Sequence, residues 1–431
     1  MSRPLRIILT NIGTMGDINP LIALAIELKR RGHTPVMAIQ SLYAPYLEQF
    51  GIAHHPIRPF MTATDSRLAE MIYDIRKGTE RGLCNFLFPV LRETYDDLLA
   101  AVTAEGGADL MLSGELVYAA PLVAEITGIP WASYLLAPIS FFSAYDPPAL
   151  PMFPRVAKAE ALLPGMGHVI QRLARYISRK WPEPIYKLRA ELGLPKGPNP
   201  LFVAKHSPNL VLALFSHILG KPQPDWPPNV LQSGFVYFDG QIGDLALAPE
   251  LEEFLAAGEP PIVFTLGSAA SLTAGSFYDY SARAAEKLGV RAILLVGKDP
   301  RNVPNFSLSS NIYVTQFAPF TTLFPRAKIV VHQGGVGTTA QALRAGIPSL
   351  VMPYSHDQPD NARRVQRLGA GLVLRRQKYT PARVVRSLRR LLNNPRYELK
   401  AKQAAAILAK ENGLKTACDA LENLEARLSK K

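Results

Sequence analysis

Residues 328–361 read KIVVHQGGVGTTAQALRAGIPSLVMPYSHDQPDN, and this stretch decides the fold that we expect. The apolar run at 329–331 is typical of a buried strand, the glycine-rich segment 333–337 of a tight turn, and the composition of residues 338–345 of a helix. Another apolar run follows at 349–352. The order strand, glycine turn, helix and strand predicts a parallel α/β sheet, in which ligands gather at the carboxyl ends of the strands.

The glycine turn and its neighbours suit a bound anion. Glycines let the backbone approach a ligand, and the unpaired amides at a helix start direct the positive end of the helix dipole toward it. His332 at the strand end adds a ring N–H, and Thr338 adds a hydroxyl. Past the second strand, Asp357 and Gln358 supply an acceptor and a donor for sugar hydroxyls. This unit predicts a phosphate site beside a hydroxyl-binding site.

Length and composition limit the function classes. The chain has 431 residues, 48% of them hydrophobic, which predicts two α/β domains with sizeable cores. Its net charge of +13 favours a nucleic acid, an anionic membrane surface or a diphosphate as partner. Zinc-finger spacing, RNA-binding signatures and interleaved basic and aromatic patches are absent from the sequence, so we expect no nucleic-acid partner. The distant Cys84 and Cys418 form neither metal spacing nor a disulfide framework, which predicts a cytoplasmic protein.

The N-terminal half opens with a similar pattern. Residues 5–10 form a β-type run, a glycine-containing loop follows, and an amphipathic helix continues to about residue 31. The segment 13–17 is therefore expected in a cleft at the carboxyl end of the first strand. The run at 262–266, followed by Gly-Ser, predicts that a second domain begins in the same way.

Two further segments bear on membranes. The longest apolar stretch, residues 116–142, is interrupted by Glu125 and three prolines, so a spanning helix is not expected. Residues 167–181 form a basic helix with apolar spacing. Either its arginines simply face water, or the segment lines an acceptor channel or contacts the inner face of a membrane.

The sequence resembles a known enzyme family. The order His, Gly-Gly, Gly-Thr and then Asp-Gln resembles the donor signature of family 1 glycosyltransferases, which use nucleotide-sugar donors on the GT-B fold. The residues that carry the resemblance are His332, Gly334, Gly335, Gly337, Thr338, Asp357, Gln358 and Asn361. The likeness covers nearly the whole chain and is strongest to bacterial members acting on glycopeptide, sterol or lipid acceptors, including rhamnolipid-type enzymes. It implies two Rossmann-like doubly wound parallel-sheet domains facing a central cleft, and inverting transfer of a sugar to an acceptor hydroxyl.

This fold divides the chain into four parts. We expect an acceptor-binding domain at 1–220, a proline-rich linker at 221–245 and a donor-binding domain at 246–400. In the GT-B fold the last helix crosses back to the first domain, and residues 401–431 are expected to do so.

The resemblance makes Asp17 the candidate general base. Plant members have a His at this position, whereas the bacterial glycopeptide and sterol group has Asp. A carboxylate with an ordinary pKa of ~3.9 cannot deprotonate an alcohol beforehand, so it must take the proton as the new bond forms. The alternative is that Asp17 only caps the turn before Pro20. Glu115 lies near the place of a carboxylate that orients the His in relatives; because it would repel Asp17, it receives no catalytic role.

The resemblance also assigns the donor site. His332 and the glycine loop are expected to bind the diphosphate. Ser268 matches the serine of a Gly-Ser pair that, in relatives, contacts the leaving diphosphate. The alternative is that Ser268 is only part of a turn. Phe317 matches an aromatic residue that, in relatives, lies against the nucleobase. The alternative is that the Phe317 side chain packs in the protein core. Many relatives bind ribose through a Glu where this chain has Ala340, beside Gln341, which leaves the choice between UDP and dTDP open.

The expected reaction is hexose transfer from UDP-glucose, the commonest donor in the family, or from dTDP-rhamnose as the alternative. The acceptor, a phenolic, sterol or hydroxy-lipid, is expected in an apolar pocket of the first domain. Its candidate aromatic residues are Phe60, Phe86, Phe141 and Tyr145. We expect no metal and no further cofactor, since the donor residues can stabilise the leaving diphosphate. A monomer or weak dimer is expected.

Two other classes remain open. Residues 335–340 also fit the dinucleotide pattern GxGxxA, which would suit an NAD-dependent oxidoreductase. That interpretation leaves His332 and the Asp-Gln pair unexplained. The second is a non-catalytic nucleotide-sugar or lipid-binding protein, against which Asp17 argues.

Overall fold

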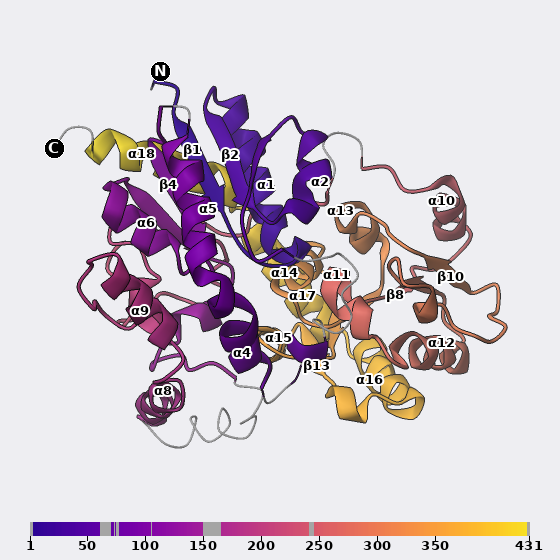
Figure 1. Ribbon diagram of the computed structural model, residues 1–431. Helices are drawn as coiled ribbons and strands as arrows, with labels where there is room; N and C mark the ends of the chain where they lie inside the picture. Colours follow the sequence, from indigo (N-terminus) through magenta and orange to yellow (C-terminus); the bar gives the residue numbers. More distant parts are fainter. Residues whose placement is uncertain are drawn as a thin grey trace.

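The computed structural model describes residues 3–60, 70–72, 74, 77–104, 106–149, 165–240 and 245–428. Within these ranges the chain forms a seven-stranded sheet of order β3-β2-β1-β4-β5-β6-β7 and a six-stranded sheet of order β10-β9-β8-β11-β12-β13 (Figure 1). Neighbouring strands pair in parallel in both sheets, for example β1 with β4 and β8 with β11. The predicted pair of doubly wound α/β sheets is confirmed.

The first sheet and its helices come mainly from the N-terminal half. Its strands are β1 (Arg6–Thr10), β2 (Thr34–Ile39), β3 (Ala53–Pro56), β4 (Leu110–Gly114), β5 (Trp131–Leu135), β6 (Val211–Ala213) and β7 (Val230–Gln232). The helices around it are α1 (Met15–Arg30), α2 (Ala44–Glu48), α4 (Gly78–Arg81), α5 (Leu91–Thr103), α6 (Ala120–Thr127), α8 (Met166–Ile177) and α9 (Glu183–Glu191).

The second sheet has the same architecture. Its strands are β8 (Ile262–Thr265), β9 (Ala292–Leu295), β10 (Ile312–Thr315), β11 (Ile329–His332), β12 (Ser349–Val351) and β13 (Gly371–Val373). The helices that follow β7 along the chain are α10 (Pro249–Ala256), α11 (Gly267–Ala270), α12 (Phe277–Leu288), α13 (Phe320–Leu323), α14 (Val336–Arg344), α15 (Gln358–Leu368), α16 (Pro381–Asn393), α17 (Arg396–Leu408) and α18 (Gly413–Leu428), and the last of them does not belong to the second sheet.

Strand alternation explains why helices cover both faces of each sheet. Successive side chains of a strand point to opposite faces. In β1, Ile7 and Leu9 join the core cluster that includes residues of α1 and α18, whereas Ile8 joins the cluster that includes residues of α5 and α6. Both faces are apolar and buried, as expected for a parallel sheet between helix layers.

The end of the chain returns to the first domain. Helix α17 packs against α14, whereas α18 packs against α1. Cys418 and Leu421 of α18 are fully buried in the first domain's core, and Arg31 after α1 forms ion pairs with Asp419 and Glu422 at 2.7 and 2.8 Å. This helix therefore ties the two halves of the chain together.

One detail differs from the expected linker at 221–245. The strand β7 lies inside that range and pairs with β6 of the first sheet. It is three residues long and follows Pro227 and Pro228, so its short apolar run has no periodicity that a sequence pattern could reveal.

A buried ion-pair network joins the domains. Arg364 of α15 contacts Asp146 of the first domain and donates from Nε to Asp360 Oδ2 at 2.6 Å. The other oxygen of Asp360 accepts from the backbone amide of Ala149 at 2.9 Å. Because α1 and α11 also lie against each other, the carboxyl ends of β1 and β8 face one another across the interface. Within the described ranges, no helix combines the length and apolarity needed to cross a bilayer.

Candidate functional site

Asp17 lies in the first turn of α1, directly after β1. Its Oδ2 accepts from the backbone amide of Thr14 at 2.8 Å and from the Thr14 hydroxyl at 3.0 Å. A Cβ at Gly13 would lie 2.6 Å from the same oxygen, so glycine allows this close approach. Among the described residues, none donates a hydrogen bond to Oδ1. Asp17 therefore caps the helix, as the alternative interpretation holds, and keeps one oxygen available to a ligand.

The surroundings of Asp17 make it a stronger base. Burial raises the pKa of Asp17 above its ordinary value, hydrogen bonds from Thr14 oppose that shift, and the charge of Glu115 adds to it. A higher pKa brings the carboxylate closer to what proton transfer from an alcohol requires.

Glu115 is engaged elsewhere. Its Oε2 pairs with Lys205 Nζ at 2.6 Å, and its Oε1 accepts from the Ser140 hydroxyl at 2.5 Å. Burial alone would raise the pKa of Glu115, but the charge and hydrogen bond of Lys205, together with Ser140, hold it below its ordinary value. Glu115 is therefore ionised, and both of its oxygens have partners.

His332 ends β11 and is fully buried. Its Nδ1 accepts from the Gly334 amide at 3.1 Å, so the ring proton lies on Nε2. Burial lowers the pKa of His332 to about 3, which keeps the ring neutral. Among the described residues Nε2 has no hydrogen-bond partner. A buried donor without a partner is unfavourable, which indicates that a ligand accepts from it.

The loop after His332 is shaped for close approach. Gly334 has φ +89°, and a Cβ there would lie 2.8 Å from Val351 Cγ1. A Cβ at Gly335 would lie 2.9 Å from Gln333 Nε2, whereas at Gly337 nothing lies within 4 Å. The helix α14 starts at Val336 with Gly335 as its N-cap, so its first amides have no partner inside the helix. These unpaired amides are hydrogen-bond donors, in addition to the Thr338 hydroxyl and the Nε2–H of His332.

Asn361 joins the two loops of the donor site. Its Nδ2 donates to the carbonyl of Gly334 at 2.9 Å and to Asp357 Oδ2 at 2.7 Å. Gln358, in the first turn of α15, accepts on Oε1 from the Tyr354 amide at 3.0 Å, so its Nε2 is the group that remains for a hydroxyl. The predicted phosphate and sugar sites are thus part of one hydrogen-bonded unit.

Asp357 interacts with Asp17 across the interface. Burial raises the pKa of Asp357 to about 7, and the charge of Asp17 is the next contribution. The charge of a first-domain carboxylate therefore reaches a carboxylate of the second domain and disfavours its ionisation.

The raised pKa of Asp357 predicts a pH dependence of stability. The folded protein holds a proton at Asp357 up to about pH 7, whereas the unfolded chain releases it near its ordinary value of 3.8. Asp357 therefore contributes stability below its unfolded pKa, and this is lost as pH rises through the folded value. We expect Asp357→Asn to remove part of the decrease in unfolding free energy between about pH 4 and about pH 7, measured by chemical denaturation. Because buried histidines contribute in the opposite direction, the difference between variant and wild type is the informative quantity; parallel curves would contradict the assignment.

The two remaining donor candidates lie at exposed positions. Ser268 is exposed in α11, and its carbonyl accepts from the Ser271 hydroxyl at 2.9 Å. Phe317 is 59% exposed, so the alternative that it packs in the core is wrong. Gln341 Nε2 donates to Asp239 Oδ1 at 2.8 Å and to the Thr321 hydroxyl at 3.2 Å, so both of its N–H groups have partners.

The four aromatic acceptor candidates do not line one described pocket. Phe60 and Tyr145 are 59% and 54% exposed, and Phe86 packs against the core beside α5 and α6. Phe141 is buried and stacks on Trp226 with ring centroids 4.0 Å apart. Aromatic composition alone could not distinguish these environments.

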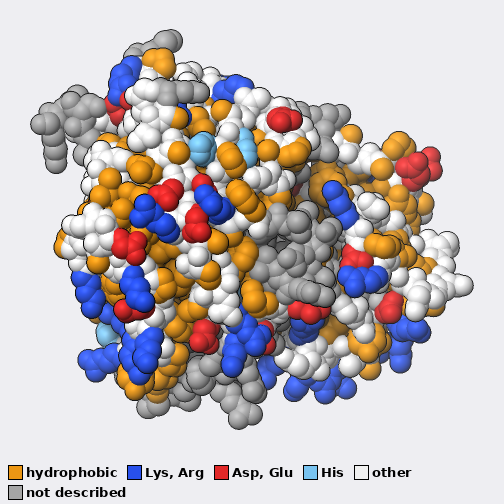
Figure 2. Space-filling model, viewed as in Figure 1, with side chains coloured by type: hydrophobic (Ala, Val, Ile, Leu, Met, Phe, Trp, Pro, Cys, Tyr) orange, Lys and Arg blue, Asp and Glu red, His pale blue; other side chains and the backbone are white. Residues whose placement is uncertain are grey.

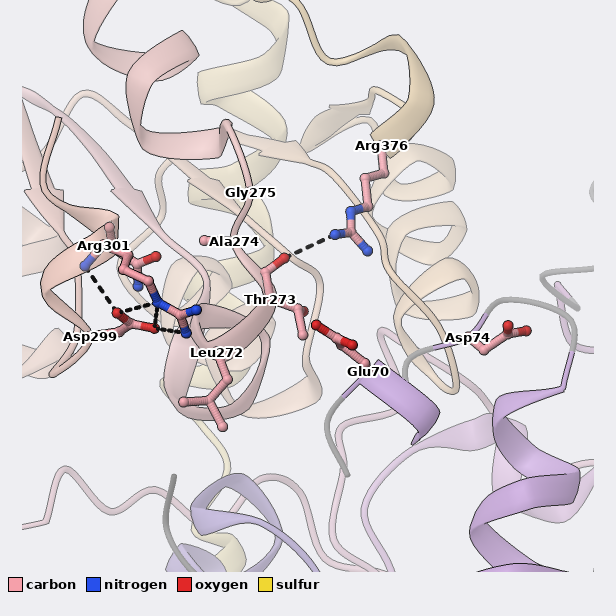
Figure 3. Close-up of a pocket in the computed structure, with 10 residues that line it drawn as sticks. Glu70, Asp74, Leu272, Thr273, Ala274, Gly275, Asp299, Arg301 and Arg376 are labelled. Carbon is pink, nitrogen blue, oxygen red and sulfur yellow. Dashed lines mark hydrogen bonds and ion pairs between the residues drawn. The ribbon is translucent and has the colours of Figure 1, made fainter. Parts of the chain in front are cut away.

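A cavity that sequence reasoning missed opens at the carboxyl edge of the second sheet. Its volume is about 670 Å³, and it is lined by Glu70, Asp74, Leu272, Thr273, Ala274, Gly275, Asp299, Arg301, Asn302 and Arg376. Figure 3 shows Arg376 donating to the Thr273 carbonyl and Arg301 paired with Asp299, with Glu70 of the first domain beside Thr273 and Asp74 farther from them. Charged residues form much of its wall, so it does not fit an apolar acceptor, and none of the predicted site residues lines it.

Comparisons with known proteins identify the family of the chain. The Glycosyltransferase family 28 N-terminal domain matches residues 7–130, and the C-terminal domain of erythromycin biosynthesis protein CIII-like proteins matches residues 292–418. Glycosyltransferase GtfC of Amycolatopsis orientalis is 31% identical over 381 residues, 86% of each chain. O-mycaminosyltylonolide 6-deoxyallosyltransferase of Streptomyces fradiae is 29% identical over 432 residues, 97% of each chain.

Solved structures share the fold. The kitacinnamycin glycotransferase superimposes with a TM-score of 0.71 at 20% identity, covering 98% of this chain and 99% of that one. The spinosyn rhamnosyltransferase SpnG, complexed with thymidine diphosphate, gives 0.69 at 17% identity, covering 96% and 99%. The two sheets therefore form a GT-B fold, and the chain belongs to the family 1 glycosyltransferases of the bacterial natural-product type.

Proposed function

We propose that the chain transfers a hexose from a nucleoside diphosphate sugar to a hydroxyl of a hydrophobic small molecule, with inversion at the anomeric carbon. The main support is the half-buried carboxylate of Asp17, whose Oδ2 accepts from Thr14 and whose Oδ1 has no hydrogen-bond donor among the described residues. The unpaired Nε2–H of His332 beside the α14 amides adds a cradle for the diphosphate.

The proposed step is a single displacement. The acceptor oxygen attacks the anomeric carbon, the bond from that carbon to the diphosphate oxygen breaks, and Asp17 Oδ1 takes the hydroxyl proton. The leaving diphosphate gains negative charge, which His332 Nε2–H, the α14 amides and the hydroxyls of Thr338 and Ser268 stabilise. Attack opposite the leaving group inverts the anomeric carbon.

We consider two donors for this site. The sequence leads to UDP-glucose, and the alternative is a thymidine diphosphate 6-deoxyhexose such as dTDP-rhamnose. Ala340 offers no acceptor for a ribose 2′-hydroxyl, and Gln341 is bound to Asp239, so nothing at this point of the site favours UDP. The 6-deoxyallosyltransferase and the complex of SpnG with thymidine diphosphate point the same way. We therefore place the thymidine diphosphate donor first and UDP-glucose second.

A product assay tests the proposal. The protein is incubated with UDP-glucose, dTDP-glucose or dTDP-rhamnose and a phenol, a sterol or a hydroxy fatty acid, and products are identified by mass spectrometry and NMR. We expect a glycoside of inverted configuration, formed fastest with a dTDP donor. A retained configuration would contradict the mechanism. Failure with every donor, together with tight but unproductive nucleotide-sugar binding, would favour the non-catalytic alternative.

We also infer that catalysis needs no metal ion. The proposed donors to the diphosphate are all protein groups, and within the described ranges no three His, Cys, Asp or Glu side chains are placed to hold a metal. We expect turnover in excess EDTA to stay within about twofold of the untreated rate, because hydrogen-bond donors and helix amides carry the leaving-group charge. Loss of activity with EDTA that added Mg²⁺ restores would contradict this inference.

A further inference from the structure

Helix α8 presents an apolar stripe to solvent. Val169, Leu173, Tyr176 and Ile177 lie on one side of this helix by their spacing, and they are 57%, 47%, 63% and 48% exposed. The opposite side packs on the protein: Gly167 is buried, and a Cβ there would meet the Ala144 carbonyl. The apolar side chains of α8 are therefore not part of the core.

The second basic helix, α16, shows the usual arrangement. Its apolar residues Val384, Val385, Leu388 and Leu391 are buried in the second domain's core, and its arginines, among them Arg386 and Arg389, are exposed. A surface helix normally turns its apolar stripe inward in this way. In α8 the apolar stripe and the arginines both face solvent. A partner that offers both apolar surface and negative charge would bind this helix.

Positive charge flanks the apolar stripe. Residues 165–182 contain no Asp or Glu, and Arg172, Arg175, Arg179 and Lys180 are all exposed. Among the described residues, none of these four forms a salt bridge; Arg179 stacks on the Tyr176 ring at 4.1 Å and Arg175 on Phe202 at 5.6 Å. Figure 2 shows Lys and Arg side chains beside hydrophobic ones at the lower left, where α8 lies in Figure 1.

An apolar stripe bordered by arginines matches the interface of an anionic bilayer. Apolar side chains enter the acyl boundary while arginines contact lipid phosphates. Residues outside the stripe hold the helix on the first domain: Gln171 donates to the Phe142 carbonyl at 3.0 Å, and the rings of Tyr145 and His168 lie 5.4 Å apart. We propose that α8 binds the surface of an anionic phospholipid membrane and thereby holds the first domain at the bilayer. This goes beyond the proposed sugar transfer and does not depend on it.

Vesicle sedimentation tests the proposal. The full chain is mixed with phosphatidylcholine vesicles, or with vesicles that contain roughly one third phosphatidylglycerol, at low and high salt. We expect binding to the anionic vesicles only, weakened by salt. The double variant Val169→Ser/Leu173→Ser should weaken binding at least tenfold, and Arg172→Gln/Arg175→Gln should do the same.

The matched control is Arg386→Gln/Arg389→Gln on α16, which removes the same charge from a helix without an exposed apolar stripe. We expect this variant to bind vesicles within about twofold of wild type, because distant charges are screened. Equal losses in both arginine variants would mean non-specific attraction and overturn the proposal. So would wild-type protein that does not sediment with vesicles, or apolar variants that change only the oligomeric state. Thermal unfolding of each variant shows that the fold is intact.

Discussion

Asp17→Asn is expected to lower kcat by about 10² to 10⁴-fold while the dissociation constant of the donor stays within about twofold. The asparagine oxygen can still accept from the amide and hydroxyl of Thr14, so the cap of α1 is retained. It cannot take a proton from the acceptor hydroxyl. Steady-state kinetics with calorimetric titration of the donor separates the two effects.

The control for Asp17 is Asp96→Asn, which makes the same carboxylate-to-amide change on the exposed side of α5. It should leave kcat unchanged. If Asp17→Asn kept wild-type turnover, Asp17 would be a helix cap only. If the variant instead lost thermal stability together with activity, the cap would account for the loss.

His332→Asn is expected to lower kcat by about 10² to 10³-fold and to weaken binding of the nucleoside diphosphate. An asparagine oxygen can accept from the Gly334 amide in place of Nδ1, whereas the Nε2–H that has no partner in the described structure is removed. The loss should therefore be specific to the diphosphate. Titrations with dTDP and with thymidine measure it, and thymidine affinity should not change.

Two further variants serve as a partial rescue and as a control for His332→Asn. His332→Gln reaches farther and keeps an N–H near the position of Nε2, so part of the diphosphate affinity should return. His54→Ala removes another histidine of lowered pKa, on β3 of the first sheet, and should have no effect on dTDP binding. Equal losses of dTDP and thymidine affinity in His332→Asn would show that the loop had collapsed rather than lost one donor.

The fold was predictable because it rests on local signals. Each half contains an apolar strand followed by a glycine-containing turn and a helix, and these patterns are confirmed at β1 with α1 and at β11 with α14. The glycines of the second turn are also explained locally, since Gly334 has a positive φ that other residues rarely adopt. Strand β7 escaped notice because a three-residue edge strand after two prolines carries no periodicity.

Long-range contacts were beyond sequence reasoning. The pairing of Gln341 with Asp239 joins residues 102 positions apart, and the influence of Asp17 on Asp357 crosses between the domains. Asn361 was visible in the signature, but its role in joining the two donor loops needed coordinates. The scattered environments of the aromatic candidates Phe60 and Phe141 show the same limit, because composition does not determine burial.

Calorimetric titration of the wild-type chain with dTDP, UDP and NAD, repeated with His332→Asn, tests the donor site most directly. Tight binding of dTDP, weaker binding of UDP and no response to NAD are expected, with dTDP affinity lost in the variant. Ligand at about 100 times its dissociation constant should also stabilise the fold by about 2.7 kcal/mol in thermal unfolding. Binding of NAD alone, or unchanged dTDP affinity in His332→Asn, would contradict a diphosphate site at the glycine loop.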